Sequence, residues 1–280
     1  MPEGQPGATP LPAAGAVLDL MRSGFLSNLL SLRRRYSTYL ASDIDKEVSQ
    51  HDDMLAGGKL DHYLSVGQSA IDVVARAMVA AQKDRFSSML DLPCGGGRVT
   101  RHLKAFLPEA KLFVGDLNKD KEAFVLAKFG ATTIDPKADF SAPSPEHFDL
   151  IFVGSLVTHV GLNQYKAAVR WFVDALAPDG LLIFTTHGRR TFHLFNGVFH
   201  SEEWREGCRG YVENGFGYHP YEPSMPPDGP TSYGTSLSAP SWIARLIEGD
   251  PSVRILSLAE GSWANNQDVV VLQKRPIAAG

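Results

Sequence analysis

Residues 89–99 read MLDLPCGGGRV, an apolar run followed by a glycine-rich turn and the start of a helical pattern. One acid, Asp91, precedes the turn, and the turn holds three consecutive glycines, of which Gly95 and Gly97 have the spacing of a glycine motif. Because glycine has no Cβ, the backbone of such a turn can approach a bound ligand closely. At the carboxyl edge of a parallel sheet, the amides of the turn and of the next helix can hold polar ligand atoms. The stretch therefore predicts a strand–turn–helix unit that binds a ligand.

Short apolar runs alternate with amphipathic helical patterns from Ser87 onward. The predicted strands are Ser88–Leu92, Leu112–Gly115, Ala131–Ile134, Leu150–Val153, Leu181–Thr185, Val253–Leu258 and Val269–Leu272. Strands that alternate with helices pair in parallel through right-handed crossovers and form a doubly wound sheet. No long helical pattern separates the last two runs, so we expect them to form an antiparallel edge. The predicted fold class is α/β.

The composition of the chain changes along its length. Residues 1–16 are mostly Gly, Pro and Ala, which cannot build a core, and they predict a disordered tail. Residues 17–85 have a helical period without strand signals and predict an N-terminal helical cap. The main domain is expected over residues 86–275, with a lid-like insertion at about 188–240. Residues 201–240, rich in Gly, Pro and aromatic residues, are expected to form an irregular functional loop.

A second acid follows the next predicted strand. Asp116 ends the run Lys111-Leu112-Phe113-Val114-Gly115 and lies 25 residues beyond Asp91. This is roughly the spacing at which an acid on the second strand reaches the hydroxyls of a ribose. One carboxylate can accept charge-assisted hydrogen bonds from two vicinal hydroxyls. The two acids together predict a cofactor that contains a nucleoside.

Two common nucleotide sites are disfavoured by the same residues. Thr100 stands where a dinucleotide fingerprint would have its third glycine, and no Walker lysine follows the turn. The Asp91 carboxylate would repel a pyrophosphate, whereas it would hold a cationic amino group. An NAD-dependent oxidoreductase is therefore the weaker interpretation.

These residues resemble those of the class I S-adenosylmethionine-dependent methyltransferases, and the resemblance covers about residues 60–275. The first family motif, D-x-G-x-G-x-G, is matched by Asp91, Gly95 and Gly97, with Pro93 in place of its first glycine. The second motif is matched at Asp116, and residues 148–159 look like the fourth. The resemblance implies a Rossmann-like, seven-stranded sheet with an antiparallel last strand, and S-adenosylmethionine as the cofactor.

The resemblance also implies which residues surround that cofactor. They are Tyr63, Gly67, Asp91, Pro93, Gly95, Gly97, Asp116, Leu117, Asp139, Ser155 and Leu156. Asp139 or Asp135 would bond the adenine amine, and we prefer Asp139 for its position ahead of the fourth strand. Tyr63 and Gly67 would close over the cofactor from the helical cap, unless Tyr63 is simply a packed aromatic.

A histidine is the expected catalytic residue. Methyl transfer to a hydroxyl requires a base, and histidine is suited to this near neutral pH. His159 follows the fourth predicted strand and His187 follows the fifth, so both should lie at the ligand-binding edge. No Cys/His cluster has the spacing of a zinc site, so no metal is expected.

Composition narrows the class of partner. The net charge of −4 gives no general attraction to nucleic acid or anionic lipid. No run of about 18 uncharged apolar residues suggests a membrane span, and the first residues lack a basic signal-peptide start. Two cysteines, Cys94 and Cys208, suit a reducing cytoplasm. We expect a cytoplasmic monomer or homodimer that acts on a small molecule.

The leading prediction is an O-methyltransferase that acts on a hydroxyl of a sugar or natural product. The ending, residues 267–272, is similar to that of bacterial methyltransferases encoded near glycosyltransferases. One alternative is carbon methylation, because His159-Val160-Gly161 and Asn163-Gln164-Tyr165 look like a segment of the cyclopropane fatty-acid synthases. Another is a non-catalytic protein that binds the cofactor and a partner.

Overall fold

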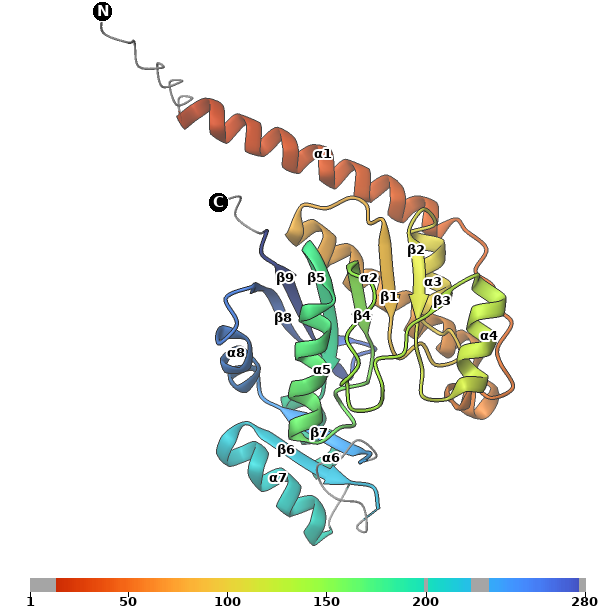
Figure 1. Ribbon diagram of the computed structural model, residues 1–280, viewed down its shortest axis with the longest axis vertical. Helices are drawn as coiled ribbons and strands as arrows, with labels where there is room; N and C mark the ends of the chain where they lie inside the picture. The colour runs from red at the N-terminus through yellow and green to blue at the C-terminus, as the bar shows by residue number, and fades with distance from the viewer. Residues whose placement is uncertain (1–13, 199–200, 223–231, 277–280) are drawn as a thin grey trace, which may run out of the picture.

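A seven-stranded mixed sheet forms the centre of the computed structural model, which describes residues 14–198, 201–222 and 232–276 (Figure 1). In spatial order its strands are β3 (Thr132–Thr133), β2 (Lys111–Val114), β1 (Ser88–Asp91), β4 (Phe148–Val153), β5 (Leu176–Thr186), β9 (Gln267–Lys274) and β8 (Val253–Trp263). The first five pair in parallel, whereas β9 runs antiparallel to both β5 and β8. The predicted Rossmann-like fold with an antiparallel last strand is confirmed.

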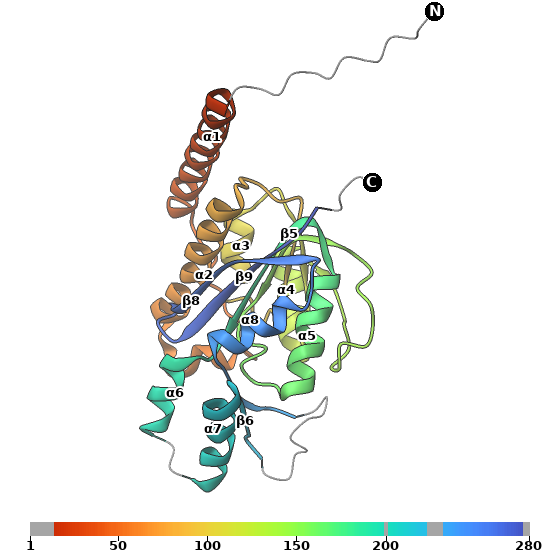
Figure 2. The same cartoon turned by 90° about the vertical axis from the view of Figure 1, so that its left-hand side faces the viewer.

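Helices cover both faces of the sheet (Figure 2). One face packs against α2 (Leu60–Ala81), α3 (Thr100–Phe106) and α4 (Lys119–Phe129), and α1 (Ala14–Leu40) packs on α2 and α3. The other packs against α5 (Leu162–Asp174) and α8 (Pro240–Glu248). The chain order places β1 and β4 side by side, so the direction of winding reverses between them. In doubly wound sheets, ligands bind at the carboxyl ends of the strands at such a reversal.

Strand β4 shows why a buried parallel sheet has no polar face. Leu150 and Phe152 belong to the core beneath α2 and α3, whereas Ile151 and Val153 belong to the core beneath α5 and α8. All four side chains are fully buried. The strand therefore appears in the sequence as a continuous apolar run rather than an alternating one. Each such side chain contributes roughly 1.5–3 kcal/mol through burial.

Helix α2 is a core helix of this sheet. It is long and apolar enough to cross a membrane by length and composition alone. Its Ile71, Val74 and Met78 side chains, however, are fully buried in the core that also contains Met89 of β1. Its hydrophobic side is thus covered by protein. The division into a helical cap at 17–85 and a separate domain at 86–275 remains a prediction, and the predicted tail at 1–16 lies almost wholly outside the described residues.

The predicted insertion at about 188–240 begins with α6 (Arg189–Asn196). Its part expected to be an irregular loop, residues 201–240, instead contains α7 (Glu202–Asn214), β6 (Phe216–Pro220) and β7 (Gly234–Ser238). Strands β6 and β7 form a separate antiparallel pair below the main sheet in Figure 1. The prediction of an irregular loop was wrong because the glycines of this segment allow close packing of regular elements. A Cβ on Gly210, for example, would lie 2.7 Å from the Phe216 carbonyl oxygen. The helix α7 needs them to lie close to β6.

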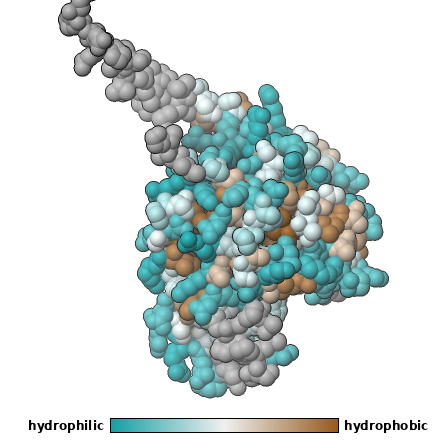
Figure 3. Space-filling model, in the orientation of Figure 1, coloured by the Kyte–Doolittle hydropathy of each residue, from teal (hydrophilic) through white to brown (hydrophobic). Residues whose placement is uncertain are grey.

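The surface is largely hydrophilic on the face seen in Figure 3, with hydrophobic residues in separate patches. The first turns of α1 extend beyond the body of the protein in both ribbon views (Figures 1 and 2). Near its other end, Arg35 donates to Glu109 at 2.6 Å and to the Phe106 carbonyl at 2.9 Å. These bonds hold the C-terminal part of α1 against the end of α3.

Candidate functional site

A cavity of about 860 Å³ opens at the carboxyl ends of β1, β2, β4 and β5. It lies where the winding of the sheet reverses, which is the expected position of a ligand site. Residues before and within the start of α2, the described residues between β6 and β7, and the turn between β8 and β9 complete its walls. The sequence-predicted site residues that line it are Asp91, Pro93, Gly95, Asp116, Leu117, Ser155, Leu156, His159 and His187.

The three glycines of the turn after β1 have different roles. Gly95 has φ +52° and a Cβ there would meet no atom within 4 Å, so this position is open toward the cavity it lines. A Cβ on Gly96 would lie 2.6 Å from the carboxyl carbon of Asp52. Gly97 has φ +82°, and its Cβ would lie 2.8 Å from the Phe129 ring of α4. Of the two predicted glycines, Gly95 is therefore open to the cavity, whereas Gly97 is required for packing.

Asp91 is an ionisable group with little protein around it to stabilise its charge. Its side chain is 1% exposed and accepts one hydrogen bond, from Thr100 Oγ1 at 2.6 Å. Burial raises the pKa of Asp91 to about 7, and the charge of Asp116 adds to this, although the Thr100 bond and Arg98 oppose it. A cation bound in the cavity would favour the carboxylate. The residue therefore fits a ligand with a positively charged group.

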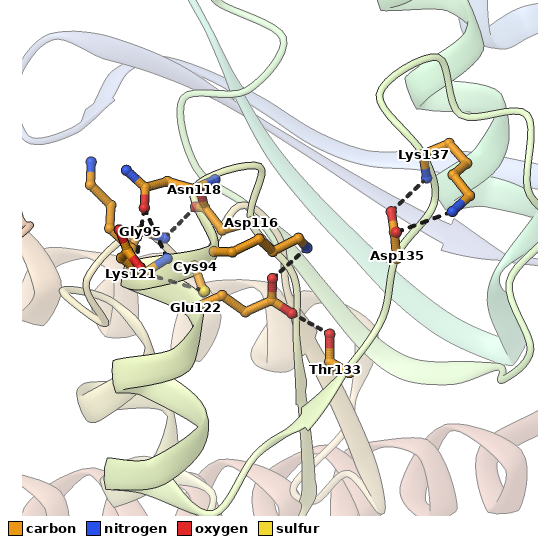
Figure 4. A network of polar contacts seen from close by, with 11 residues as sticks. Cys94, Gly95, Asp116, Asn118, Lys121, Glu122, Thr133, Asp135 and Lys137 are labelled. Carbon is orange, nitrogen blue, oxygen red and sulfur yellow. Dashed lines mark hydrogen bonds and ion pairs between the residues drawn. The ribbon is translucent and has the colours of Figure 1, made fainter.

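Asp116 is held at the end of β2 by backbone amides (Figure 4). Its Oδ2 accepts from the Gly95 amide and its Oδ1 from the Asn118 amide, both at 2.8 Å. The Asn118 side chain in turn accepts from the amides of Asp120 and Lys121 at the start of α4. Each carboxylate oxygen keeps a further lone pair. The arrangement fixes the acid at the cavity wall and leaves it able to accept bonds from ligand hydroxyls.

The preference for Asp139 over Asp135 is not supported by their positions. Asp139 does not line the cavity; its carboxylate accepts from the Ser141 amide at 3.0 Å in an exposed turn. Asp135 does line the cavity, beside Lys137, with which it forms an ion pair at 3.3 Å. The turn from Asp135 to Phe140 points the earlier acid inward, which spacing along the sequence could not reveal. Asp135 is therefore the acid on this side of the cavity.

Gln164 contacts the turn that follows Asp135 and carries a buried acceptor. Gln164 of α5 lines the cavity and donates through Nε2 to the Ala138 carbonyl at 2.7 Å. This bond orients the amide, and its Oε1 is buried without a hydrogen-bond partner. A buried acceptor without a partner is costly, so a group that donated a hydrogen bond to it would be stabilised.

Ser155 is held in an unusual conformation at the end of β4. It has φ +61°, its amide donates to Thr185 Oγ1 at 2.8 Å, and its hydroxyl accepts from Gln267 at 2.8 Å. The neighbouring Leu156 also lines the cavity, as does Leu117, which is 76% exposed. Strands β4, β5 and β9 thus fix the cavity floor together.

Tyr63 and Gly67 do not line the cavity. Tyr63 is 1% exposed and its hydroxyl donates to Asp52 Oδ2 at 2.6 Å. A Cβ on Gly67 would lie 2.7 Å from His102 Nε2 and would also collide with the Arg98 carbonyl. Both residues join α2 to the segment behind the glycine turn. They support the turn and do not close over it, so the packed-aromatic interpretation of Tyr63 agrees with its position.

His159 and His187 come together, as their places after neighbouring strands predict. Their ring centroids are 6.0 Å apart. The His159 Nδ1 lies 2.8 Å from the Gly234 carbonyl oxygen, and Tyr233 stacks on the ring at 4.8 Å. Burial lowers the pKa of His159, and burial together with His159 lowers that of His187 to about 3. Both rings are neutral at neutral pH.

Strand β7 supplies the part of the site that sequence analysis missed. Its Gly234, Ser236 and Ser238 amides donate to the carbonyls of His159, Thr158 and His187, respectively, at 2.8–2.9 Å. Tyr221, Tyr233 and Trp263 also line the cavity. The only available signal was the aromatic content of residues 201–240, which does not indicate where the rings lie. Among the described residues, no three His, Cys, Asp or Glu side chains are grouped as a metal site would require.

Comparison with known proteins agrees with this geometry. The methyltransferase domain family matches residues 60–225, more than half of the chain. A curated malonyl-[acyl-carrier protein] O-methyltransferase of Bacillus cereus is 25% identical over 146 residues, which are 50% of this chain and 52% of that protein. The chain thus spans about half the length of the curated relatives it matches.

Two solved structures share the fold. An S-adenosylmethionine-dependent methyltransferase from Clostridium acetobutylicum has a TM-score of 0.51 and 14% identity, over 76% of this chain and 92% of its own. A 1,6-didemethyltoxoflavin-N1-methyltransferase from Burkholderia thailandensis has a TM-score of 0.51 and 13% identity, over 96% and 94%. Together with the family match, the open Gly95, the buried Asp91 and the fixed Asp116 lead to one conclusion: the chain belongs to the methyltransferase domain family and uses S-adenosylmethionine as its cofactor.

Proposed function

We propose that this methyltransferase transfers its methyl group to a hydroxyl of a small-molecule acceptor, a sugar or natural product, with His159 as the general base. One observation carries the proposal. The His159 ring lines the cavity with Nδ1 bonded to the Gly234 carbonyl, and Nε2 has no hydrogen-bond partner among the residues that the structure describes.

The Gly234 carbonyl determines which nitrogen of His159 can act. A carbonyl oxygen only accepts, so Nδ1 carries the proton and Nε2 carries the lone pair. Because burial lowers the pKa of His159, this tautomer stays unprotonated at neutral pH. A base in this state can take a proton from a hydroxyl placed about 3 Å from Nε2. His187 is almost fully buried and is assigned to the wall behind His159.

The cofactor half of the cavity would hold S-adenosylmethionine through the residues described above. Asp91 is assigned to the cationic methionine part, Asp116 to the ribose hydroxyls, and Asp135 with Gln164 to the adenine amine. The sulfonium methyl is already activated, so the protein mainly has to align the acceptor and remove its proton. Ser155 and Leu156 form the wall between the two halves.

The two alternatives from sequence have less support. The tyrosine of the segment that resembles cyclopropane fatty-acid synthases, Tyr165, is fully buried and packs against Phe216 and Trp242. It therefore lies outside the cavity. A protein that only binds the cofactor would not need the unpaired Nε2 of His159 at the cavity. Release of S-adenosylhomocysteine that depends on an acceptor would distinguish an enzyme from a binding module.

His159→Ala tests the proposal directly. With any acceptor that supports turnover, the variant should lose about 10²- to 10⁴-fold in kcat, because acid–base catalysis contributes that range. Calorimetry should give an unchanged Kd for S-adenosylhomocysteine. In the wild type, kcat/KM should fall only below the ordinary histidine pKa of ~6.5, since burial lowers that of His159.

The control is His193→Ala, because His193 is an exposed histidine of α6 that does not line the cavity. It should keep wild-type turnover. If His159→Ala also keeps wild-type turnover, or if the acidic limb of the profile stays after that substitution, His159 is not the base and hydroxyl transfer loses its support.

A further inference from the structure

One end of the cavity is free of charged side chains. We call it the aromatic end; it comprises the lining residues at the carboxyl ends of β4 and β5, in α6, and between β6 and β7. Within the described part of the chain these are Gly154, Ser155, Leu156, His159, Val160, His187, Phe195, Tyr221, Ser232 and Tyr233. Its two histidines have lowered pKa values and are neutral. All the lining acids, lysines and arginines belong to the other walls.

The rings of the aromatic end contact one another. Tyr233 stacks on His159 with an interplanar angle of 28°, and Tyr221 meets Tyr233 edge-on at 5.4 Å. Phe195 meets His187 edge-on at 5.8 Å. Tyr221 and Tyr233 are nevertheless 52% and 53% exposed. Part of the surface of these two rings therefore remains open for a ligand to cover.

The hydroxyls at this end are mostly bonded already. The Tyr221 oxygen lies 3.2 Å from His159 Nδ1, which donates to Gly234, and accepts from Thr235 at 3.3 Å. Ser232 is paired with the Tyr218 hydroxyl at 2.6 Å. A ligand with many hydroxyl groups would find few free partners here and would bury them at a cost. A carboxylate or phosphate would find no described cation.

We propose that the acceptor is an uncharged aromatic hydroxyl compound, a phenol or hydroxylated heteroaromatic, whose ring packs against Tyr221 and Tyr233 and whose hydroxyl lies beside His159 Nε2. The inference rests on the proposed function and narrows its acceptor class. In the reaction the hydroxyl proton passes to His159, the oxygen forms a bond to the methyl carbon, and the bond between that carbon and sulfur breaks to leave a neutral thioether.

The acidity of the acceptor supports the same class. A phenol has a pKa of about 10, whereas an aliphatic hydroxyl is closer to water, near 15.7. The neutral His159 is a weak base because its pKa is lowered. Proton transfer is more effective when the two groups are closer in pKa, which favours the phenol. Aromatic pairs also contribute about 0.5–1.5 kcal/mol beyond the burial of area.

Three probes separate the possible classes. Saturation-transfer NMR on the full chain, saturated with S-adenosylhomocysteine, would use 4-methylphenol, methyl α-D-glucopyranoside and benzoate. We expect a signal from 4-methylphenol and at least five-fold weaker signals from the neutral sugar and the aromatic anion. Stronger binding of the glucoside or of benzoate overturns the inference, as does the absence of any 4-methylphenol signal while S-adenosylhomocysteine still binds.

Two variants of Tyr233 test whether 4-methylphenol binds at the aromatic end. Tyr233→Leu should reduce the 4-methylphenol signal at least five-fold, and the matched variant Tyr233→Phe should keep it, because only the ring is required. Equal signals in the two variants overturn the inference. The proposed function can fail separately from this inference. If 4-methylphenol binds as expected but His159→Ala retains full turnover, the aromatic acceptor site is supported, and the proposal that His159 is the base for hydroxyl transfer is wrong.

Discussion

The two halves of the cavity are built in different ways. The cofactor half consists of the ends of β1, β2 and β3 and the turns that follow them, so Asp91, Gly95 and Asp116 are each positioned by the nearest strand. The acceptor half depends on β7, which lies far along the chain and binds the ends of β4 and β5 through its backbone amides. Local sequence therefore determines one half, and tertiary docking determines the other.

This difference suggests that the halves can be damaged independently. Among the residues that the structure describes, no hydrogen bond joins β7 to the glycine turn after β1. Gly234, in contrast, both donates to the His159 carbonyl and accepts from the His159 ring. A change at Gly234 should therefore reach the base without reaching the cofactor.

Gly234→Ala should have the largest effect. A Cβ at this position would lie 2.7 Å from Pro220 Cα and would collide with the His219 carbonyl, so β7 would have to move away from β6. Turnover should fall about 10²- to 10⁴-fold, as for loss of the base. The Kd for S-adenosylhomocysteine, measured by calorimetry, should stay within about three-fold of wild type.

Gly249→Ala is the matched control, because a Cβ there would meet nothing within 4 Å. Its turnover should equal that of the wild type. A large loss of cofactor affinity in Gly234→Ala would show that the halves are coupled, and the comparison above would then be wrong.

The same difference explains what could be predicted from the sequence. The apolar runs located all seven strands of the main sheet, and the signal is clearest for strands such as β4, whose residues are buried on both faces and therefore continuously apolar. Asp91, Gly95 and Asp116 were found because a strand end and its turn lie within a few residues of each other. His159 and His187 were found because parallel neighbours end at the same edge.

The remaining predictions depended on packing between distant segments. Gly67 was interpreted as a cofactor residue, but its lack of a side chain makes room for His102. Asp139 and Asp135 are four residues apart, and only the path of the turn decides which of them points inward. The aromatic residues of 201–240 gave no indication that β7 would pair with the ends of β4 and β5. Such contacts have no local sequence pattern.

Asp91→Asn should separate stability from cofactor binding. The pKa of Asp91 is about 7 in the folded protein and near 3.8 when unfolded, so between these values the folded state holds a proton that the unfolded state releases. The free energy that burial of this ionisable group takes from folding stability is therefore zero below pH ~3.8, grows as the pH rises and reaches its full value above ~7. Removing it should stabilise the ligand-free protein at pH 8 by about 2–4 kcal/mol.

Thermal unfolding at pH 5 and pH 8 would check this, with Asp139→Asn as the exposed control. The gain for Asp91→Asn should be larger at pH 8 than at pH 5, and the control should show no gain. Affinity for S-adenosylmethionine should fall, because an amide cannot pair with a cationic group. A variant that is less stable at both pH values would mean that the carboxylate has a protein partner that compensates its burial.

The smallest effects should distinguish the three acids after β2 and β3. Asp116→Ala removes an acceptor fixed by two backbone amides, so S-adenosylhomocysteine affinity should fall by roughly 1.5–3 kcal/mol, the range for bonds to a charged group. Asp135→Ala should cost about 0.5–1.5 kcal/mol, because this acid is half-exposed and already paired with Lys137. Asp139→Ala should leave the affinity unchanged, since its carboxylate lies outside the cavity. Calorimetry on the three variants would give the order directly, and a greater loss for Asp139→Ala than for Asp135→Ala would mean that the turn between them adopts a different path when the cofactor is bound.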